Sequence, residues 1–211
     1  KCETIEGLCE KYDAIVVIAP SNPETHLRYA EKVLPYGKLT YIDKTFAPDV
    51  ATAEKIFELG EKYGAKLFSS SALRYATELK GLAPDSFIVT GGGSNFPEYL
   101  VHQAEIASVL TSGESFVGGS VTRNGAQRVC SLEFTGGKRA TLIFSPSLPF
   151  TVCAETNGED AFRELNSDYF AALIRDITGF FARGVVPVAK EETLKVMSIR
   201  EALINADEKL K

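Results

Sequence analysis

Histidine and cysteine are scarce in this 211-residue sequence, and their scarcity argues against several kinds of site. Two histidines are too few for a His-rich metal centre, and no pair of cysteines has the C-x-x-C spacing of a metal or redox motif. We therefore predict no metal site. Two of the four cysteines lie inside apolar runs, which indicates reduced core thiols in a cytoplasmic protein. The four are Cys2, Cys9, Cys130 and Cys153.

Long hydrophobic runs and a positive charge excess are also missing. No apolar stretch reaches the length that spans a bilayer, so we expect no membrane partner. The formal net charge of -5 argues against nucleic acids and anionic lipid surfaces, because an acidic surface repels both. The hydrophobic content of 45% and charged content of 24% are typical of a globular protein.

The first third of the sequence alternates strand patterns with helix patterns. The continuous apolar run at 13–18 is typical of a strand buried on both faces of a parallel sheet. Such alternation predicts right-handed βαβ crossovers and an α/β domain over residues 1–72. The predicted strands are 13–18, 39–42 and 66–69, and the predicted helices are 3–12, 23–34, 50–63 and 72–79.

The remainder, residues 73–211, has a different pattern. Several strand-like runs follow one another without helices between them, and Asn124-Gly125 and Gly136-Gly137 are strong hairpin signals. This predicts an α+β domain with a mixed or antiparallel sheet and helices on one face. We interpret Gly91-Gly92-Gly93-Ser94 as a flexible connector. The predicted strands are 86–90, 115–123, 127–134, 139–145 and 150–154, and the predicted helices are 97–110, 168–183 and 191–208.

The predicted parallel strands end at Ala19-Pro20, Asp43-Lys44 and Ser69-Ser70. The carboxyl ends of neighbouring parallel strands meet at one crevice, which is where open α/β sheets bind ligands. An ammonium at that edge can hold a ribose or substrate hydroxyl and assist proton transfer. The alternative is that Lys44 is an ordinary solvated loop lysine.

A second candidate constellation lies on the predicted helix 97–110. Glu98 and His102 are four residues apart and therefore share a helix face. A carboxylate can orient an imidazole, and histidine is suited to proton transfer near neutral pH. The alternative is a half-buried histidine paired with an acid for stability.

The order of these motifs resembles the Gfo/Idh/MocA family of oxidoreductases. The resemblance rests on Asp-Ala-Ile-Val-Val-Ile-Ala-Pro at 13–20 with His26, on Gly37-Lys38 followed by Ile42-Asp43-Lys44-Thr45, and on the helix that carries Glu98 and His102. The closing residues 180–187 and 191–206 are also similar to the family's last helices. The similarity covers nearly the whole chain in order.

The resemblance implies a partial Rossmann domain over 1–72 and a substrate-binding and dimerisation domain over 73–211, with the last helices packed on the latter. It implies hydride transfer between NAD or NADP and a hydroxyl carbon of a sugar, polyol or similar small molecule. The implied catalytic residues are Lys44, His102 and Glu98. The implied cofactor-binding residues are Ala19, Pro20, His26, Asp43 and Lys44, and the implied substrate-binding residues are Arg74 and His102.

The sequence departs from the family pattern in places. Thr45 replaces a proline, so we expect a trans bond before it, because a non-proline cis bond costs about 2.5–4 kcal/mol. Glu98 replaces an aspartate. The G-x-G-x-x-G turn that seats the cofactor phosphates is missing. We expect one further βαβ pair upstream, without which residues 15–18 form an open apolar edge and the chain is not competent for catalysis.

Other functions remain open at this point. The fold can serve a non-enzymatic ligand-sensing or assembly protein, and a sugar isomerase or lyase could use Glu98 and His102 without a dinucleotide. Neither the substrate nor the choice between NAD and NADP follows from the sequence. We also expect a homodimer or larger assembly through the sheet of residues 115–154, with Val121, Val129, Ser131 and Ile143 on the contact face.

Overall fold

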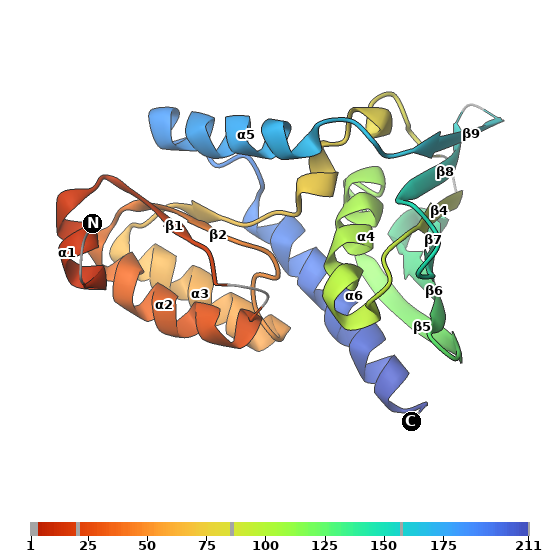
Figure 1. Cartoon of the computed structure of the whole chain (residues 1–211), viewed down its shortest axis with the longest axis horizontal. Coiled ribbons are helices and arrows are strands. Elements are labelled where there is room, and N and C mark those ends of the chain that lie inside the picture. The colour runs from red at the N-terminus through yellow and green to blue at the C-terminus, as the bar shows by residue number, and fades with distance from the viewer. Residues whose placement is uncertain (1–3, 20–21, 85–86, 157, 211) are drawn as a thin grey trace. The chain divides into compact units, whose positions relative to one another are not determined.

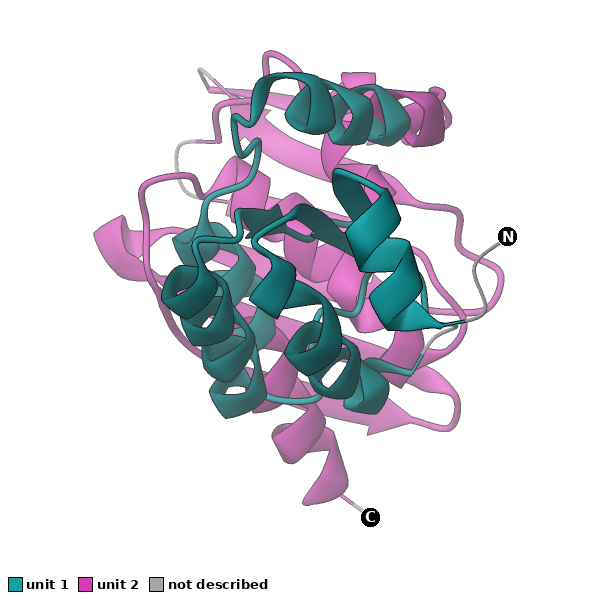
Figure 2. Ribbon diagram, turned by 90° about the vertical axis from the view of Figure 1, so that its left-hand side faces the viewer, with its two compact units in different colours: residues 1–71, 173–197 teal, residues 72–172, 198–211 magenta. Residues whose placement is uncertain are grey.

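The computed structural model describes residues 4–19, 22–84, 87–156 and 158–210. The chain divides into two compact units (Figure 2). Unit 1 comprises residues 1–71 and 173–197, and unit 2 comprises residues 72–172 and 198–211. The predicted fold class, a partial parallel α/β sheet followed by a mixed sheet with helices, is confirmed.

Unit 1 contains a three-stranded parallel sheet with the order β1-β2-β3. Helices α2 and α3 lie side by side on one face of the sheet (Figure 1). On the other face, Phe180 of α5 packs edge-on against Phe68 at 5.2 Å between ring centroids. The elements are α1 Ile5–Lys11, β1 Ala14–Val17, α2 His26–Val33, β2 Leu39–Ile42, α3 Val50–Tyr63 and β3 Leu67–Phe68, with α5 spanning Tyr169–Arg183.

A short polar side chain defines where helix α3 begins. The Asp49 carboxylate accepts a hydrogen bond from the backbone N–H of Thr52 at 2.7 Å, which caps α3. This hydrogen bonding lowers the pKa of Asp49. The helix ends at Gly64, whose φ of 66° is the left-handed conformation that glycine adopts at little cost.

Residues 173–197 belong to unit 1, whereas the sequence places them in the second domain. Met197, in α6 (Lys190–Glu208), is part of the buried core of unit 1. Lys66 Nζ donates to the Gly184 carbonyl oxygen at 2.9 Å, and Lys190 pairs with Glu61 at 2.7 Å. The prediction was wrong because sequence order does not show which core an amphipathic helix joins.

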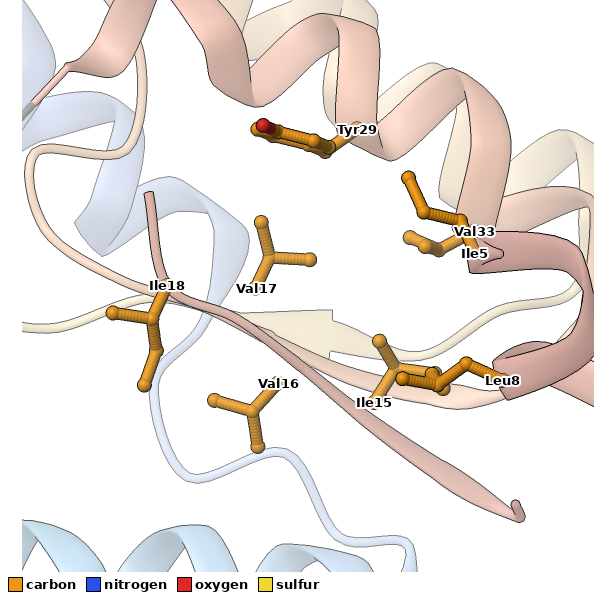
Figure 3. A pocket seen from close by; sticks show the side chains of 8 residues that line it. All are labelled: Ile5, Leu8, Ile15, Val16, Val17, Ile18, Tyr29 and Val33. Carbon is orange, nitrogen blue, oxygen red and sulfur yellow. The ribbon is translucent and has the colours of Figure 1, made fainter. Parts of the chain in front are cut away.

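Strand β1 forms an open apolar edge, as expected. Within the described residues it pairs only with β2, and Val16 and Ile18 are 45% and 71% exposed. In Figure 3, Val17 points toward Tyr29 of α2 and Val16 points to the opposite side of the strand. A groove of about 240 Å³ runs along this edge. It is lined by Ile5, Leu8, Ile15, Val16, Val17, Ile18, Tyr29 and Val33.

Unit 2 contains a six-stranded sheet with the order β5-β6-β7-β4-β8-β9. Strands β4 and β7 are parallel, and the other neighbours are antiparallel. The strands are β4 Phe87–Gly91, β5 Phe116–Asn124, β6 Gln127–Phe134, β7 Arg139–Phe144, β8 Thr151–Thr156 and β9 Glu159–Glu164. The sequence did not predict β9, and residues 72–79 form two short 3-10 helices, Ala72–Tyr75 and Thr77–Leu79, in place of the predicted helix.

One face of this sheet is buried. Cys130, Leu132 and Phe134 alternate with exposed residues along β6, and helix α4 (Phe96–Leu110) contacts β4 and β7. Burial, with a smaller contribution from the Asp207 carboxylate, raises the pKa of the Cys130 thiol to about 12. This thiol is therefore a protonated core group near neutral pH.

A buried ion pair joins the end of α6 to β6. Arg128 Nε donates to Asp207 Oδ1 at 2.5 Å, and only 10% and 9% of these two side chains are exposed. Arg128 also donates to the carbonyl oxygens of Gly125 and Gln127. The guanidinium is thereby satisfied on several sides, as a buried charge requires.

The strand register places the residues expected on the contact face on two different faces of the sheet. Val129 and Ser131 are exposed on β6, and Ile143 lies opposite Val129, so these three share the outer face. Val121 lies opposite the fully buried Cys130 and therefore belongs to the inner face. Its predicted position was wrong because the unbroken hairpin register from Asn124 and Gln127 places it opposite Cys130 and not on the face of Val129.

We predict that Asp207→Ala lowers the free energy of unfolding by about 3–5 kcal/mol, because it leaves the Arg128 charge buried without its carboxylate. Urea unfolding followed by circular dichroism measures this change. The exposed Glu208 on the same helix provides the control, since Glu208→Ala is expected to change stability by less than about 0.5 kcal/mol. Equal losses for the two variants would contradict a structural role for the pair.

Candidate functional site

The parallel register of unit 1 places the ends of β1, β2 and β3 along one edge. Val17 pairs with Ile42, and the Asp43 N–H continues the ladder by donating to the Val17 carbonyl oxygen at 2.9 Å. The next residue, Lys44, is half-buried on the turn that follows β2. Ala19 is buried after β1, and the predicted cofactor residue Pro20 lies outside the described residues.

Buried side chains hold the turn that carries Lys44. The Tyr41 hydroxyl is within hydrogen-bond distance, 3.2 Å, of both Asp43 Oδ1 and the Ser70 carbonyl oxygen. On the other side of Lys44, Phe46 is 2% exposed and packs against Phe57 at 4.9 Å between ring centroids. The turn is therefore joined to the core on both sides of the lysine.

The peptide bond between Lys44 and Thr45 is cis, so the expectation of a trans bond was wrong. That expectation considered only the intrinsic preference of an isolated bond. It did not include the tertiary packing of Thr45, Phe46 and Ala47, all of which are buried.

His26, which the resemblance assigns to the cofactor, is completely buried. Its Nδ1 lies 3.0 Å from the Phe46 carbonyl oxygen, two residues beyond Lys44. Helix α2 is thus attached to the Lys44 turn through the imidazole of its first residue.

His102 lies half-buried on α4 among aromatic rings of unit 2. Its ring centroid is 5.5 Å from that of Tyr99 and 5.9 Å from that of Phe150, both in edge-to-face geometry. On the preceding turn of the helix, Glu98 Oε2 accepts a hydrogen bond from the Asn95 amide at 3.3 Å. The imidazole therefore has apolar neighbours, which sequence reasoning did not identify because Phe150 is 48 residues away along the chain.

Gly92 and Gly93 make room for two of these rings. Gly91 ends β4, and the Gly92 N–H donates to the Ile143 carbonyl oxygen at 3.0 Å. A Cβ at Gly92 would lie 2.7 Å from Phe150, and one at Gly93 would lie 2.7 Å from Tyr99. Their φ angles of 118° and 84° also favour glycine. The segment connects β4 to α4, as the sequence predicts, and close ring packing explains why glycines stand at 92 and 93.

Gln103, beside His102 on α4, is completely buried and hydrogen-bonded. Its Oε1 accepts from the Thr90 hydroxyl at 2.6 Å. Its Nε2 donates to the Gly92 and Ile143 carbonyl oxygens at 2.5 and 3.0 Å. This network fixes α4 against β4 and β7 and thereby orients the turn that carries His102. The sequence offered only a weak signal, a single amide on the apolar stripe of a helix.

Arg74, a predicted substrate residue, forms a buried ion pair. Its Nε donates to Glu105 Oε2 on α4 at 2.8 Å, and the two side chains are 12% and 4% exposed. The sequence did not predict this pairing, because residues 31 apart in the chain meet only through the tertiary fold.

The described residues provide two separate functional groups suited to catalysis. Unit 1 offers an ammonium at the carboxyl edge of a parallel sheet, and unit 2 offers an imidazole suited to proton transfer. Among the described residues, no three His, Cys, Asp or Glu side chains are grouped so that they could hold a metal ion. In the same part of the chain, none of the helices has both the length and the apolar composition needed to traverse a membrane.

No family profile and no curated protein sequence matches this chain. Solved structures do match its fold. UDP-N-acetylglucosamine 3-dehydrogenase GnnA from Acidithiobacillus ferrooxidans aligns with a TM-score of 0.78 and 16% identity, over 97% of this chain and 83% of GnnA. GenD2 from gentamicin A biosynthesis, solved with NAD, aligns with a TM-score of 0.82 and 12% identity, over 100% of this chain and 81% of GenD2.

A third structure, the aldose-aldose oxidoreductase from Caulobacter crescentus complexed with glycerol, aligns with a TM-score of 0.71 and 20% identity, over 99% of this chain and 82% of the enzyme. The structural neighbours are dehydrogenases and oxidoreductases of the Gfo/Idh/MocA type. This chain shares their fold, which confirms the resemblance at the level of architecture. Identities this low carry no further conclusion about its chemistry.

We predict that Gln103→Leu lowers the free energy of unfolding by about 2–4 kcal/mol, because it strands the Thr90 hydroxyl and the Gly92 carbonyl oxygen and removes one of the two donors to the Ile143 carbonyl oxygen. Thermal and urea unfolding measure the loss. Gln127→Leu, the same substitution at an exposed strand position, is the matched control and is expected to be nearly neutral. A Gln103→Leu protein as stable as this control would show that the network does not hold α4.

Proposed function

We propose that this chain is part of an NAD- or NADP-dependent oxidoreductase. It would transfer a hydride between the nicotinamide and a hydroxyl carbon of a sugar, polyol or similar small molecule. The observation that carries the proposal is the turn at Asp43-Lys44, whose backbone is fixed by hydrogen bonds. This turn lies at the edge of a parallel sheet where such folds bind ligands. The shared fold with NAD-bound GenD2 and glycerol-bound aldose-aldose oxidoreductase supports it.

The proposed roles follow from the chemistry of each side chain. The Lys44 ammonium donates hydrogen bonds to the nicotinamide ribose and to the substrate hydroxyl. His102 accepts the hydroxyl proton as the carbinol carbon gives up its hydride, and Glu98 supports the imidazole. Asp43, Ala19 and Pro20 are the residues proposed to bind the cofactor, and of these Asp43 and Ala19 lie at the sheet edge of unit 1. His102 and Arg74 serve the substrate, although Arg74 also pairs with Glu105.

The nicotinamide, when bound, supplies the acceptor for the two electrons of the hydride. The residues at the sheet edge fit its ribose end, because a lysine and an aspartate there can hydrogen-bond hydroxyl groups. Its phosphates need a glycine-rich turn at a helix N-terminus, which this sequence does not contain. We propose that a further βαβ pair supplies that turn and that its strand pairs with the open edge of β1 (Figure 3).

The unpaired thiols of Cys9, Cys130 and Cys153 support a reducing, cytoplasmic setting for this enzyme.

In the protein with its complete dinucleotide-binding domain, Lys44→Ala and His102→Ala are each expected to lower kcat/KM by about 10²–10⁴-fold. Circular dichroism and the melting temperature should stay close to those of the parent. Lys32→Ala, at an exposed position on α2, is the control and should leave turnover unchanged. NADH and NADPH titrations, read by nicotinamide fluorescence, test the cofactor independently of the substrate. Full turnover of both variants, or no binding of either nucleotide, would overturn the proposal in favour of a ligand-sensing role.

We further propose that a second copy of this chain covers the outer face of the six-stranded sheet between residues 115 and 154. Val129 is 41% exposed there and lies beside Ile143, so the face presents apolar side chains to solvent. Val129→Asp is expected to shift sedimentation toward the monomer, because it would bury a carboxylate at the contact. Ala51→Asp, on an exposed position of α3, is the control. A parent protein that sediments as a monomer at micromolar concentration would exclude this assembly.

A further inference from the structure

The imidazole of His26 is the clearest buried polar group that the proposed chemistry does not use. The side chain is 0% exposed, so it presents no surface to a ligand. It projects from the first residue of α2 to the turn after β2, 20 residues further along the chain. A histidine buried to this extent needs a reason, because an apolar side chain would fill the space without the cost of desolvating two ring nitrogens.

The single hydrogen bond of this ring sets its protonation. Nδ1 lies 3.0 Å from the Phe46 carbonyl oxygen, which can only accept. Nδ1 therefore carries a proton and donates it to this carbonyl. Within the described part of the chain, Nε2 has no hydrogen-bond partner. The contact with Phe46 is thus the ring's polar anchor, and Nδ1 is its donor.

The same turn is held at its other end by a second side chain. The Tyr41 hydroxyl contacts Asp43 Oδ1 at 3.2 Å, and the Asp43 N–H donates to the Val17 carbonyl oxygen. Tyr41 thus holds the chain on the N-terminal side of Lys44, and His26 holds it on the C-terminal side. The two contacts bracket the lysine, and all the groups involved belong to unit 1.

We propose that His26 is a positioning residue that fixes the turn bearing Lys44, through the hydrogen bond from its Nδ1 to the Phe46 carbonyl oxygen. The consequence for Lys44 rests on the function proposed above. A catalytic ammonium must be held close to its productive position, and a small displacement of its backbone costs activity. His26 would therefore affect the cofactor through Lys44 and not by contact.

Substitution of His26 by Asn or by Gln distinguishes the roles of its two ring nitrogens. The Asn amide nitrogen takes the place of Nδ1, whereas the longer Gln side chain carries its amide nitrogen to the region of Nε2. His26→Asn therefore retains a donor for the Phe46 carbonyl, and His26→Gln loses it while keeping polarity and approximate size. The pair distinguishes loss of this hydrogen bond from simple loss of a buried histidine.

Two measurements that need no catalysis test the hydrogen bond. Because the sequence has two histidines, comparison with His102→Ala assigns the His26 ring signals in ¹⁵N NMR spectra. We expect a proton on Nδ1. We also expect the Asp43 amide to exchange about tenfold or more faster in His26→Gln, and within about threefold of the parent in His26→Asn. A ring with no proton on Nδ1, or equal exchange in the two variants, would overturn the proposal.

A double-mutant cycle tests whether the effect passes through Lys44. His26→Gln is expected to weaken NADH binding about tenfold in the parent and to have little effect in a Lys44→Ala background. Equal weakening in both backgrounds would show that His26 does not act through Lys44. If the parent binds no nucleotide, the proposed function fails, whereas the tautomer and the exchange rates still decide whether His26 holds the turn.

Discussion

The parallel pairing of β1 with β2 is the constraint on which the candidate cofactor edge depends. It brings Val17 beside Ile42 and allows the Asp43 N–H to extend the ladder by one further hydrogen bond. Without that register, the end of β2 would not meet the end of β1, and Lys44 would be an isolated loop lysine. The register itself follows from burial, because a shift by one residue would move Ile15 and Val17 out of the core. Hydrophobic packing thus determines where an ammonium is placed.

In unit 2, buried polar groups fix the position of the helix that carries His102. Helix α4 carries an apolar stripe, but an apolar stripe alone allows a helix to slide or rotate. The buried amide of Gln103 and the Arg74–Glu105 pair add directional contacts that specify one position. The Gln103 amide has hydrogen-bond partners and the two ions have each other, so the free-energy cost of burying these groups is largely offset. His102 is on the same helix, and the position of its backbone is therefore set by Gln103 and by the Arg74–Glu105 pair.

The sequence predicted most of the architecture because its patterns were strong. The apolar run at 39–42 and the helix at 50–63 agree with the structure, since β-branched and apolar runs, an Asp49 cap and a terminal Gly64 are all local signals. Strand β9 was missed because Glu159–Glu164 is largely polar and exposed. Lys44 and His102 could be proposed from position alone. Tyr41, Gln103 and Phe150 could not, because their importance arises from partners that are distant in the sequence.

The structural neighbours retain this architecture at 11–20% identity, so the fold tolerates replacement of most side chains. The function proposed for this chain depends on a narrower feature: a cation at the end of β2, and a backbone that holds it. In this chain the backbone on either side of Lys44 is held by Tyr41 and His26, both buried and both within unit 1. The geometry of the turn is therefore established by the packing of one sheet and two helices. A ligand that binds there need not order the turn itself, and the free energy of its binding remains available for orienting the reacting groups.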